Sequence, residues 1–331
     1  MNFNYLCRAF RKPWYLDVSC LFNVFSINYF VLTVWKYNKK VLMNLIYKIP
    51  GYILCLLGGF FLSWGGLIVR SFREADIWQI LFLRSLFFLL ALSIFLILTY
   101  KKNTITIIRK SGLPGLIGGI VLSFSFISYV VSMTETTVAN VVFIISTQTM
   151  FLAIMGYFFL KEKISLIGFL SIFLAMSGIL IMVGDSINQG SLFGNLVALA
   201  IPINFSILVV IIRKYPNLDM IPAIFYSGIF SMIYGFFLAD ELIFSNHDIF
   251  MGFLLGVPQL AFGFICITIG SRSTPAVTVG LLMLLESICG TLWVWIFLDE
   301  VPPLSVILGG AIIIVAIITK YFDRKKIIAN N

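Results

Sequence analysis

Long apolar runs separated by short polar segments follow one another along the chain from Pro50 onward. A helix that rises about 1.5 Å per residue needs about 20 apolar residues to cross a hydrocarbon core of about 30 Å, and most of these runs approach or exceed that length. Hydrophobicity is near-continuous within each run rather than alternating, so the pattern predicts membrane helices and not barrel strands. We expect ten spans, near residues 51–69, 77–99, 112–132, 137–160, 164–183, 191–212, 220–239, 249–270, 274–298 and 304–322.

Composition places this chain outside the soluble proteins. Of its 331 residues, 60% are hydrophobic and 11% charged, and the mean hydropathy is +1.05. Soluble domains are about 45 to 50% apolar and about 25% charged. We therefore predict an all-α integral membrane protein with the lipid bilayer as its surroundings. The net charge of +9 is spread over short clusters between the apolar runs, which favours orientation signals and not a nucleic-acid site.

The distribution of basic residues predicts an orientation. With a cytoplasmic N-terminus, the inner segments hold 20 of the 23 Lys and Arg residues, and the outer loops hold only Arg70 and Arg73. Such an excess of basic residues on the cytoplasmic side is the usual rule, whereas acidic residues contribute little. Ten crossings return the chain to its starting side, so both termini are expected in the cytoplasm.

Residues 1–49 do not match a span. They mix basic and aromatic residues around the semi-apolar run 18–34, which is short and polar and has no A-x-A-like cleavage site. We interpret them as a cytoplasmic or interfacial extension; the alternative is that translation starts at Met43. The remaining chain is divided into two five-span units, 50–183 and 191–322, and a basic cytoplasmic tail, 323–331.

The two units are related by an internal repeat. An offset of 138 residues places Lys161-Glu162 on Asp299-Glu300 and Thr136 on Thr274. Because each unit has an odd number of spans, the second is expected to be inverted in the membrane, an arrangement common in transporters. The same offset places Gln148 opposite Glu286, near the midplane and the pseudo-twofold axis.

Glu286 is a carboxylate in the middle of a long apolar segment. A charge at the bilayer centre costs about 3 kcal/mol on insertion scales, which the surrounding apolar residues offset. Ionisable groups at this depth usually face a wet interior and mark a transport path. The alternative is a neutral glutamic acid that only hydrogen-bonds neighbouring helices together.

Several short motifs, in order along the chain, resemble the EamA-type carriers of the drug/metabolite transporter superfamily. They are Trp64-Gly65, Leu83-Arg84, Glu162, Gly194 and Glu300, together with the duplication of five spans. The resemblance covers about residues 50–322. It implies ten helices in two inverted repeats, a bacterial inner-membrane location and transport of small metabolites through a cavity between the halves.

The chain also departs from this pattern. Gln148 and Ser287 stand where the family often has proline. Both changes make the central helices stiffer or alter their polarity. The substrate therefore cannot be carried over from a relative.

Two sets of polar side chains are candidates for function. Arg84 is the only base more than two residues inside a predicted span; it would pair with an anionic substrate group or a carboxylate, or else extend to the outer headgroups. Other residues would line the cavity, or else join helices as structural hydrogen-bonding groups. They are Trp64, Tyr129, Asn140, Gln148, Asn204, Tyr226, Gln259 and Trp293.

Residues of two further kinds bear on the architecture. Pro202 and Pro258 would bend the sixth and eighth spans, and the pairs Gly115/Gly119 and Gly252/Gly256 would let helices approach closely. Glu162 and Glu300 are either solvated turn charges or parts of a salt-linked gate at each membrane face.

The residues present exclude several chemistries. Five cysteines without a C-x-x-C pair and a single histidine predict neither a metal site nor another cofactor. No P-loop is present, so no ATPase is expected in this chain. An embedded enzyme is a poor alternative because the acidic pairs Asp240-Glu241 and Asp299-Glu300 have no His or Cys beside them.

We therefore predict a secondary transporter of small metabolites that works by alternating access, without enzymatic activity. Amino acids, their derivatives, vitamins or drugs are the expected substrates. Proton coupling is a hypothesis that rests on Glu286. A channel or a non-transporting scaffold is the remaining alternative. Substrate, direction, coupling ion and the choice between monomer and homodimer stay open.

Overall fold

A computed structural model describes residues 49–136, 138–162, 164–183, 191–298 and 304–329. The predicted extension 1–49, apart from Ile49, lies outside the described residues, as does the alternative start at Met43. Within the described ranges the regular structure is helical and contains no strand, which confirms the predicted all-α fold class.

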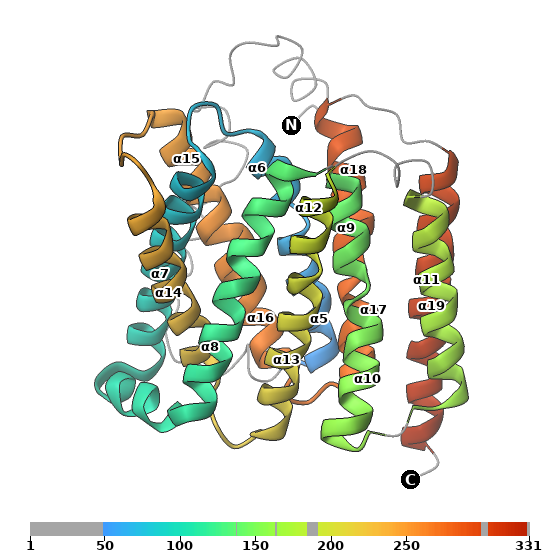
Figure 1. Ribbon diagram of the computed structural model, residues 1–331. Helices are drawn as coiled ribbons and strands as arrows, with labels where there is room; N and C mark the ends of the chain where they lie inside the picture. The colour runs from blue at the N-terminus through green and yellow to red at the C-terminus, as the bar shows by residue number, and fades with distance from the viewer. Residues whose placement is uncertain (1–48, 137, 163, 184–190, 299–303, 330–331) are drawn as a thin grey trace, which may run out of the picture. The chain divides into compact units, whose positions relative to one another are not determined.

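Each predicted span has a helical counterpart, and neighbouring helices run side by side up and down the bundle (Figure 1). The helices are α5 (Gly51–Leu62), α6 (Gly65–Arg70), α7 (Ile77–Tyr100), η1 (Lys101–Asn103), α8 (Thr104–Glu135), α9 (Val138–Ser146), α10 (Gln148–Leu160), α11 (Leu166–Val183), α12 (Leu192–Ala198), α13 (Ala200–Lys214), α14 (Ile221–Leu238), α15 (Asn246–Leu254), the π-helical η3 (Leu255–Ala261), α16 (Phe262–Gly270), α17 (Ala276–Met283), α18 (Leu285–Leu298) and α19 (Leu304–Ala329).

Many of these helices are long enough to cross a membrane. In the described part of the chain, 6 helices are long and apolar enough to cross a bilayer, and three shorter apolar helices accompany them. One of the six, Ile77–Glu135, combines α7 and α8, although the chain turns at Lys101, whose φ is 51°. The number of crossings therefore stays a prediction. The tail predicted from residue 323 continues α19 as far as Ala329.

Four spans are interrupted within their length, which the hydrophobic pattern does not predict. The interruptions separate α5 from α6, α9 from α10, α12 from α13 and α17 from α18. At three of them the backbone forms i→i+3 bonds: Thr147 N–H to Ile144, Leu199 to Leu196 and Leu284 to Leu281, at 3.1, 3.3 and 3.2 Å. Such tight turns inside helices often mark hinges.

Small residues bring helices of the bundle into backbone contact. A Cβ added at Gly119 of α8 would lie 2.9 Å from the carbonyl oxygen of Ala223 in α14. A Cβ added at Gly256 of η3 would lie 2.6 Å from the carbonyl oxygen of Arg84 in α7. Close approach to another helix is thus present at Gly119, Gly252 and Gly256, whereas Gly115 mainly meets Ser111 of its own helix. At Gly256 it positions Arg84 against the π-helical segment.

Helices α11 and α19 pack chiefly on each other at the edge of the bundle (Figure 1). Ala175, Ile179, Ile313 and Ala316 form their shared core with Leu281 of α17. The functional residues discussed below lie in the other helices.

Loops at the two ends of the bundle differ in charge. One end, which we call the basic face, carries Lys101, Lys102, Lys161, Arg213, Lys214 and Arg272 together with Glu162 and Asp219. The other end, the acidic face, carries Glu74, Asp76, Glu135, Asp240 and Glu241 together with Arg70 and Arg73. This separation follows the charge distribution from which the orientation was predicted.

The acidic face is held together partly by Asp248, in the first turn of α15. Its buried carboxylate accepts hydrogen bonds from the backbone N–H groups of Arg73, Glu74 and Ala75 at 3.1 to 3.2 Å. His247 beside it contacts the carbonyl oxygen of Ser71 at 2.9 Å. The loop between α6 and α7 is therefore fixed to α15.

Candidate functional site

A cavity of about 50 Å³ lies among the interrupted helices. This volume holds roughly three water molecules. Apolar and aromatic residues form most of the wall, and five polar residues come from α7, α8, α10, η3 and α18. The wall consists of Leu62, Arg84, Ser125, Phe126, Tyr129, Ile145, Gln148, Ile201, Phe205, Gln259, Leu260, Phe264, Met283 and Glu286.

Arg84 is buried, with 2% of its surface exposed. Its guanidinium carbon lies 4.8 Å from the ring centroid of Phe126 and 5.1 Å from that of Tyr129. Its Nε and Nη1 groups have no hydrogen-bond partner among the described residues. The alternative that Arg84 extends to the headgroups is therefore wrong, because its side chain faces the cavity.

The surroundings of Arg84 offset only part of the cost of its charge. A buried cation costs about 3 kcal/mol on insertion scales, and a cation–π contact contributes about 0.5 to 2 kcal/mol. Each buried N–H without a partner costs a further 1 to 3 kcal/mol or so. The site is therefore short of a hydrogen-bond acceptor, which an anionic ligand group would supply.

Glu286 lies on the wall of the same cavity. The interruption at Leu284 makes it the second residue of α18, where the positive end of the helix dipole favours a carboxylate. Arg84 and Glu286 form no ion pair, since the described residues show an ion pair within 4.0 Å only between Arg213 and Glu162. Two ionisable groups thus share the cavity without an ion pair between them.

Two glutamines complete the polar wall. Gln259 donates from Nε2 to the carbonyl oxygen of Leu62 at 3.1 Å. Leu62 ends α5, so the interruption of the helix there leaves its carbonyl group available. The Oε1 atom of Gln259 is buried without a partner in the described structure. Gln148 opens α10, and the repeat had placed it opposite Glu286; both line the cavity.

Trp64 and Trp293 lie outside the cavity wall, nearer the acidic face. Their rings stack with centroids 4.1 Å apart, and Trp293 Nε1 donates to Ser63 Oγ at 2.8 Å. Trp293 lies two turns beyond Glu286 along α18. The two tryptophans therefore join the interruption between α5 and α6 to α18 rather than forming the cavity itself.

The other three predicted residues also lie elsewhere. Asn140 donates to Thr136 Oγ1 at 3.4 Å at the acidic end of α9. The hydroxyl of Tyr226 bonds the carbonyl oxygen of Ile108 at 3.4 Å. Asn204 is half-buried on α13 and is not part of the wall. A role for these three in substrate binding stays a prediction without support from the cavity.

Sequence reasoning missed the apolar part of the wall and polar contacts between the halves, among them a pair of buried serines. Phe126 and Phe205 both pack edge-to-face against Phe264, at centroid distances of 5.2 and 6.4 Å. The buried hydroxyls of Ser146 and Ser287 are 2.6 Å apart. Within apolar helices a phenylalanine or serine carries no signal that distinguishes the wall from the rest of the bundle.

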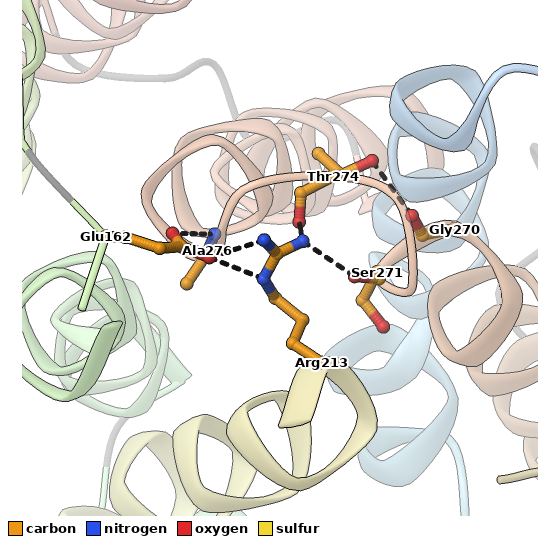
Figure 2. A network of polar contacts seen from close by, with 6 residues as sticks. All are labelled: Glu162, Arg213, Gly270, Ser271, Thr274 and Ala276. Atoms are coloured by element: carbon orange, nitrogen blue, oxygen red, sulfur yellow. Dashed lines mark hydrogen bonds and ion pairs between the residues drawn. The ribbon is translucent and has the colours of Figure 1, made fainter. Parts of the chain in front are cut away.

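At the basic face, Glu162 and Arg213 form an ion pair at 2.5 Å, shown with its neighbours in Figure 2. Arg213 Nη1 also donates to the carbonyl oxygens of Thr274 and Ser271, the latter at 3.4 Å. The second carboxylate oxygen of Glu162 accepts from the N–H of Ala276 at 2.9 Å. We call this set the basic latch.

The basic latch bears on the two interpretations of Glu162, and a gating role stays a prediction. Only 16% of its side chain is exposed, so it is not a solvated turn charge. Arg213, counted from the sequence only as an orientation signal, is its partner. Glu300, the predicted counterpart of Glu162, lies outside the described residues.

The chain is similar to three known proteins. It is 25% identical over 299 residues to an uncharacterized transporter of Clostridium kluyveri, covering 83% of this chain and 94% of that protein. It is 26% identical over 211 residues to an uncharacterized transporter of Methanothermobacter thermautotrophicus, covering 60% of each. A solved crystal structure matches the fold with a TM-score of 0.71 at 14% identity, covering 84% of this chain and 98% of that one.

The sequence model of the EamA-like transporter family matches the chain twice, at residues 49–184 and 192–321. The matches cover most of the chain, and each falls on one of the two units predicted from the sequence. Together with the apolar helices of membrane-crossing length, they establish a multi-pass membrane protein. This chain belongs to the EamA-like transporter family.

Proposed function

We propose that the protein is a secondary transporter that carries a small zwitterionic metabolite, such as an amino acid or a derivative, by alternating access. One observation carries the proposal: the buried Arg84, which has unpaired N–H groups, lines the same cavity as Glu286. The membrane is the bacterial inner membrane, with the basic face and both termini in the cytoplasm.

The polar groups of the cavity match the two ends of a zwitterion. Arg84 offers donors for a carboxylate, since guanidinium and carboxylate form strong charge-assisted bonds. Gln259 Oε1 and the Glu286 carboxylate are acceptors suited to an ammonium group. The aromatic wall contributed by Phe126 and Phe264 would surround an apolar substituent. At about 50 Å³ the cavity is smaller than an amino acid, so binding requires it to widen from the conformation described.

The interrupted helices support movement around this cavity. Thr147 and Leu284, where α9–α10 and α17–α18 are interrupted, are 137 residues apart, close to the repeat offset of 138. Discontinuous helices at the interface of inverted repeats surround the midplane sites of many carriers. Each of the two flanks this cavity with a polar residue, Gln148 or Glu286. The two halves would turn at these points.

Uptake into proteoliposomes tests the proposal. A mixture of radiolabelled amino acids is offered first, and alanine is then compared with propionate and propylammonium, which each lack one charged end. We expect uptake of amino acids and a loss of at least about tenfold in the variant Arg84→Gln, because a charge-assisted hydrogen bond is removed.

Asn204→Ala serves as the control, because Asn204 is polar and half-buried but lies outside the cavity wall. It should transport like the unmodified protein. Uptake that is equal with Arg84→Gln, or a preference for propionate over alanine, would contradict the zwitterion assignment.

A further inference from the structure

The arginines at the ends of α6 and α13 occupy equivalent positions in the two halves. Arg70 and Arg213 are 143 residues apart, the same spacing that separates Gly51 from Gly194 at the beginnings of these spans. The threonines Thr136 and Thr274, each beginning the fourth span of its half, are related by the offset of 138.

Each arginine bonds the threonine of its own half. Arg70 Nη2 donates to the carbonyl oxygen of Thr136 at 3.2 Å at the acidic face. Arg213 Nη1 donates to the carbonyl oxygen of Thr274 at the basic face (Figure 2). Both threonines are buried. One arginine–threonine corner is therefore present at each face of the bundle.

The other half supplies a glycine to each corner. A Cβ added at Gly194 would lie 2.9 Å from the Cβ of Thr136. A Cβ added at Gly51 would lie 2.6 Å from the Oγ1 of Thr274. Neither position has room for a side chain without movement of its neighbours. The two corners thus repeat the same contact of an arginine, a threonine and a glycine at opposite faces, as expected for an inverted duplication.

The corner at the basic face has an additional contact. Glu162, at the end of α10, belongs to the first half, whereas Arg213 and Ala276 belong to the second. Its carboxylate therefore joins the two halves where three spans meet. Because one oxygen accepts from the arginine and the other from the start of α17, separating the halves here would leave both donors unpaired.

We propose that the two arginine–threonine corners are the pivots of the gates, and that the basic latch keeps the gate at the basic face closed. Loss of the Glu162–Arg213 pair opens the cavity toward the basic face. This inference rests on the proposed function, since it assumes a carrier that opens to each side in turn. Its test needs no substrate, so it can fail independently of the transport assay.

A cysteine placed at Ser125 reports on the cavity. Ser125 lines the wall, and the substitution is nearly isosteric. The background replaces the native cysteines Cys7, Cys20, Cys55, Cys266 and Cys289. A membrane-impermeant maleimide is applied separately to right-side-out and inside-out vesicles. We expect Glu162→Gln and Arg213→Gln to raise the labelling rate about tenfold from the side of the basic face and to lower it from the other side.

Arg272→Gln is the matched control. Arg272 lies at the same face and donates to the carbonyl oxygens of Pro216 and Leu218, all within the second half. It should leave labelling unchanged. The exchanged pair Glu162→Arg with Arg213→Glu restores an ion pair and should return part of the closed population. Unchanged labelling in the single variants, or an equal rise in Arg272→Gln, would overturn the latch.

Should a charge-removing variant fail to reach the membrane, Arg213→Lys provides the second measurement. It keeps the charge and loses the forked geometry that spans Glu162 and the carbonyl oxygens. An intermediate labelling rate supports the latch, and a rate equal to that of the unmodified protein contradicts it.

Discussion

Arg84 and Glu286 give the cavity its chemical character. Both are ionisable side chains at depths where a charge is costly, and they form no direct ion pair with each other. The aromatic rings of Phe126 and Tyr129 stabilise the guanidinium without consuming its N–H groups. A residue stabilised in this way can stay buried and still bind a ligand.

Glu286 can be tested apart from Arg84. The variant Glu286→Gln keeps the shape and loses the titrating group, so we expect uptake to lose its dependence on an imposed proton gradient. The other titratable or charged groups on the cavity wall are Arg84 and Tyr129. Uptake by proteoliposomes at fixed substrate is measured with and without a pH gradient.

The matching control is Gln148→Glu in the same background, which returns a carboxyl at the position related by the repeat. Partial return of the gradient dependence would support proton carriage in the cavity. An unchanged response in Glu286→Gln would exclude Glu286 as the coupling group.

At the scale of elements, the glycine contacts determine how closely the helices approach. Gly256 in η3 lies against the backbone of α7 at Arg84 and Phe88. The π-helical turn around Pro258 positions Gln259 toward Leu62. Arg84 and Gln259 therefore reach the cavity because these backbones are in contact.

Two glycine-to-alanine substitutions separate packing from helix propensity. Gly256→Ala should lower the free energy of unfolding by about 1 to 3 kcal/mol, since its Cβ would overlap the backbone of α7. Gly310→Ala in α19 should be neutral or stabilising by up to about 1 kcal/mol, because an added Cβ meets nothing within 4 Å there.

Thermal unfolding of both variants in the same detergent provides the measurement. The midpoint of Gly256→Ala is expected to fall and that of Gly310→Ala to stay or rise. If both variants shifted equally, the close approach of η3 and α7 would not be what limits this site.

At the scale of the whole molecule, the same contacts recur at opposite faces. Arg70 with Thr136 at the acidic face corresponds to Arg213 with Thr274 at the basic face. The family model likewise matches the two halves separately. Because the two halves make the same contacts at opposite faces, each half can adopt at its own face the set of contacts that the other half makes at the opposite face.

Single cysteines at equivalent positions test the inversion directly. Ser71 and Lys214 follow the two equivalent arginines and are 143 residues apart. In cells treated with an impermeant thiol reagent, we expect Ser71→Cys to be labelled from outside and Lys214→Cys only after permeabilisation. Labelling of both positions from the same side would refute the inverted repeat.

Much of this architecture could be predicted from the sequence because it depends on residue type and spacing. Continuous apolar runs predict helices wherever a bilayer is the solvent, since backbone groups have no other partners there. The repeat placed Gln148 opposite Glu286, and both line the cavity. Single polar residues were less informative: Arg84 lines the cavity, whereas Asn204 does not, and both are polar residues in apolar helices.

The sequence by itself determined the helical membrane class, the family and the duplication. The hydrophobic pattern and the order of the motifs can be recognised without knowing which residues are in contact. Only the tertiary structure decided which face of each helix turns inward. It also decided where the helices are interrupted, since Thr147, Leu199 and Leu284 are residues that elsewhere continue a helix. The partnership of Arg213 and Glu162 also depends on the tertiary structure, because packing brings together residues 51 positions apart. No local sequence pattern indicates which distant helix will be the neighbour.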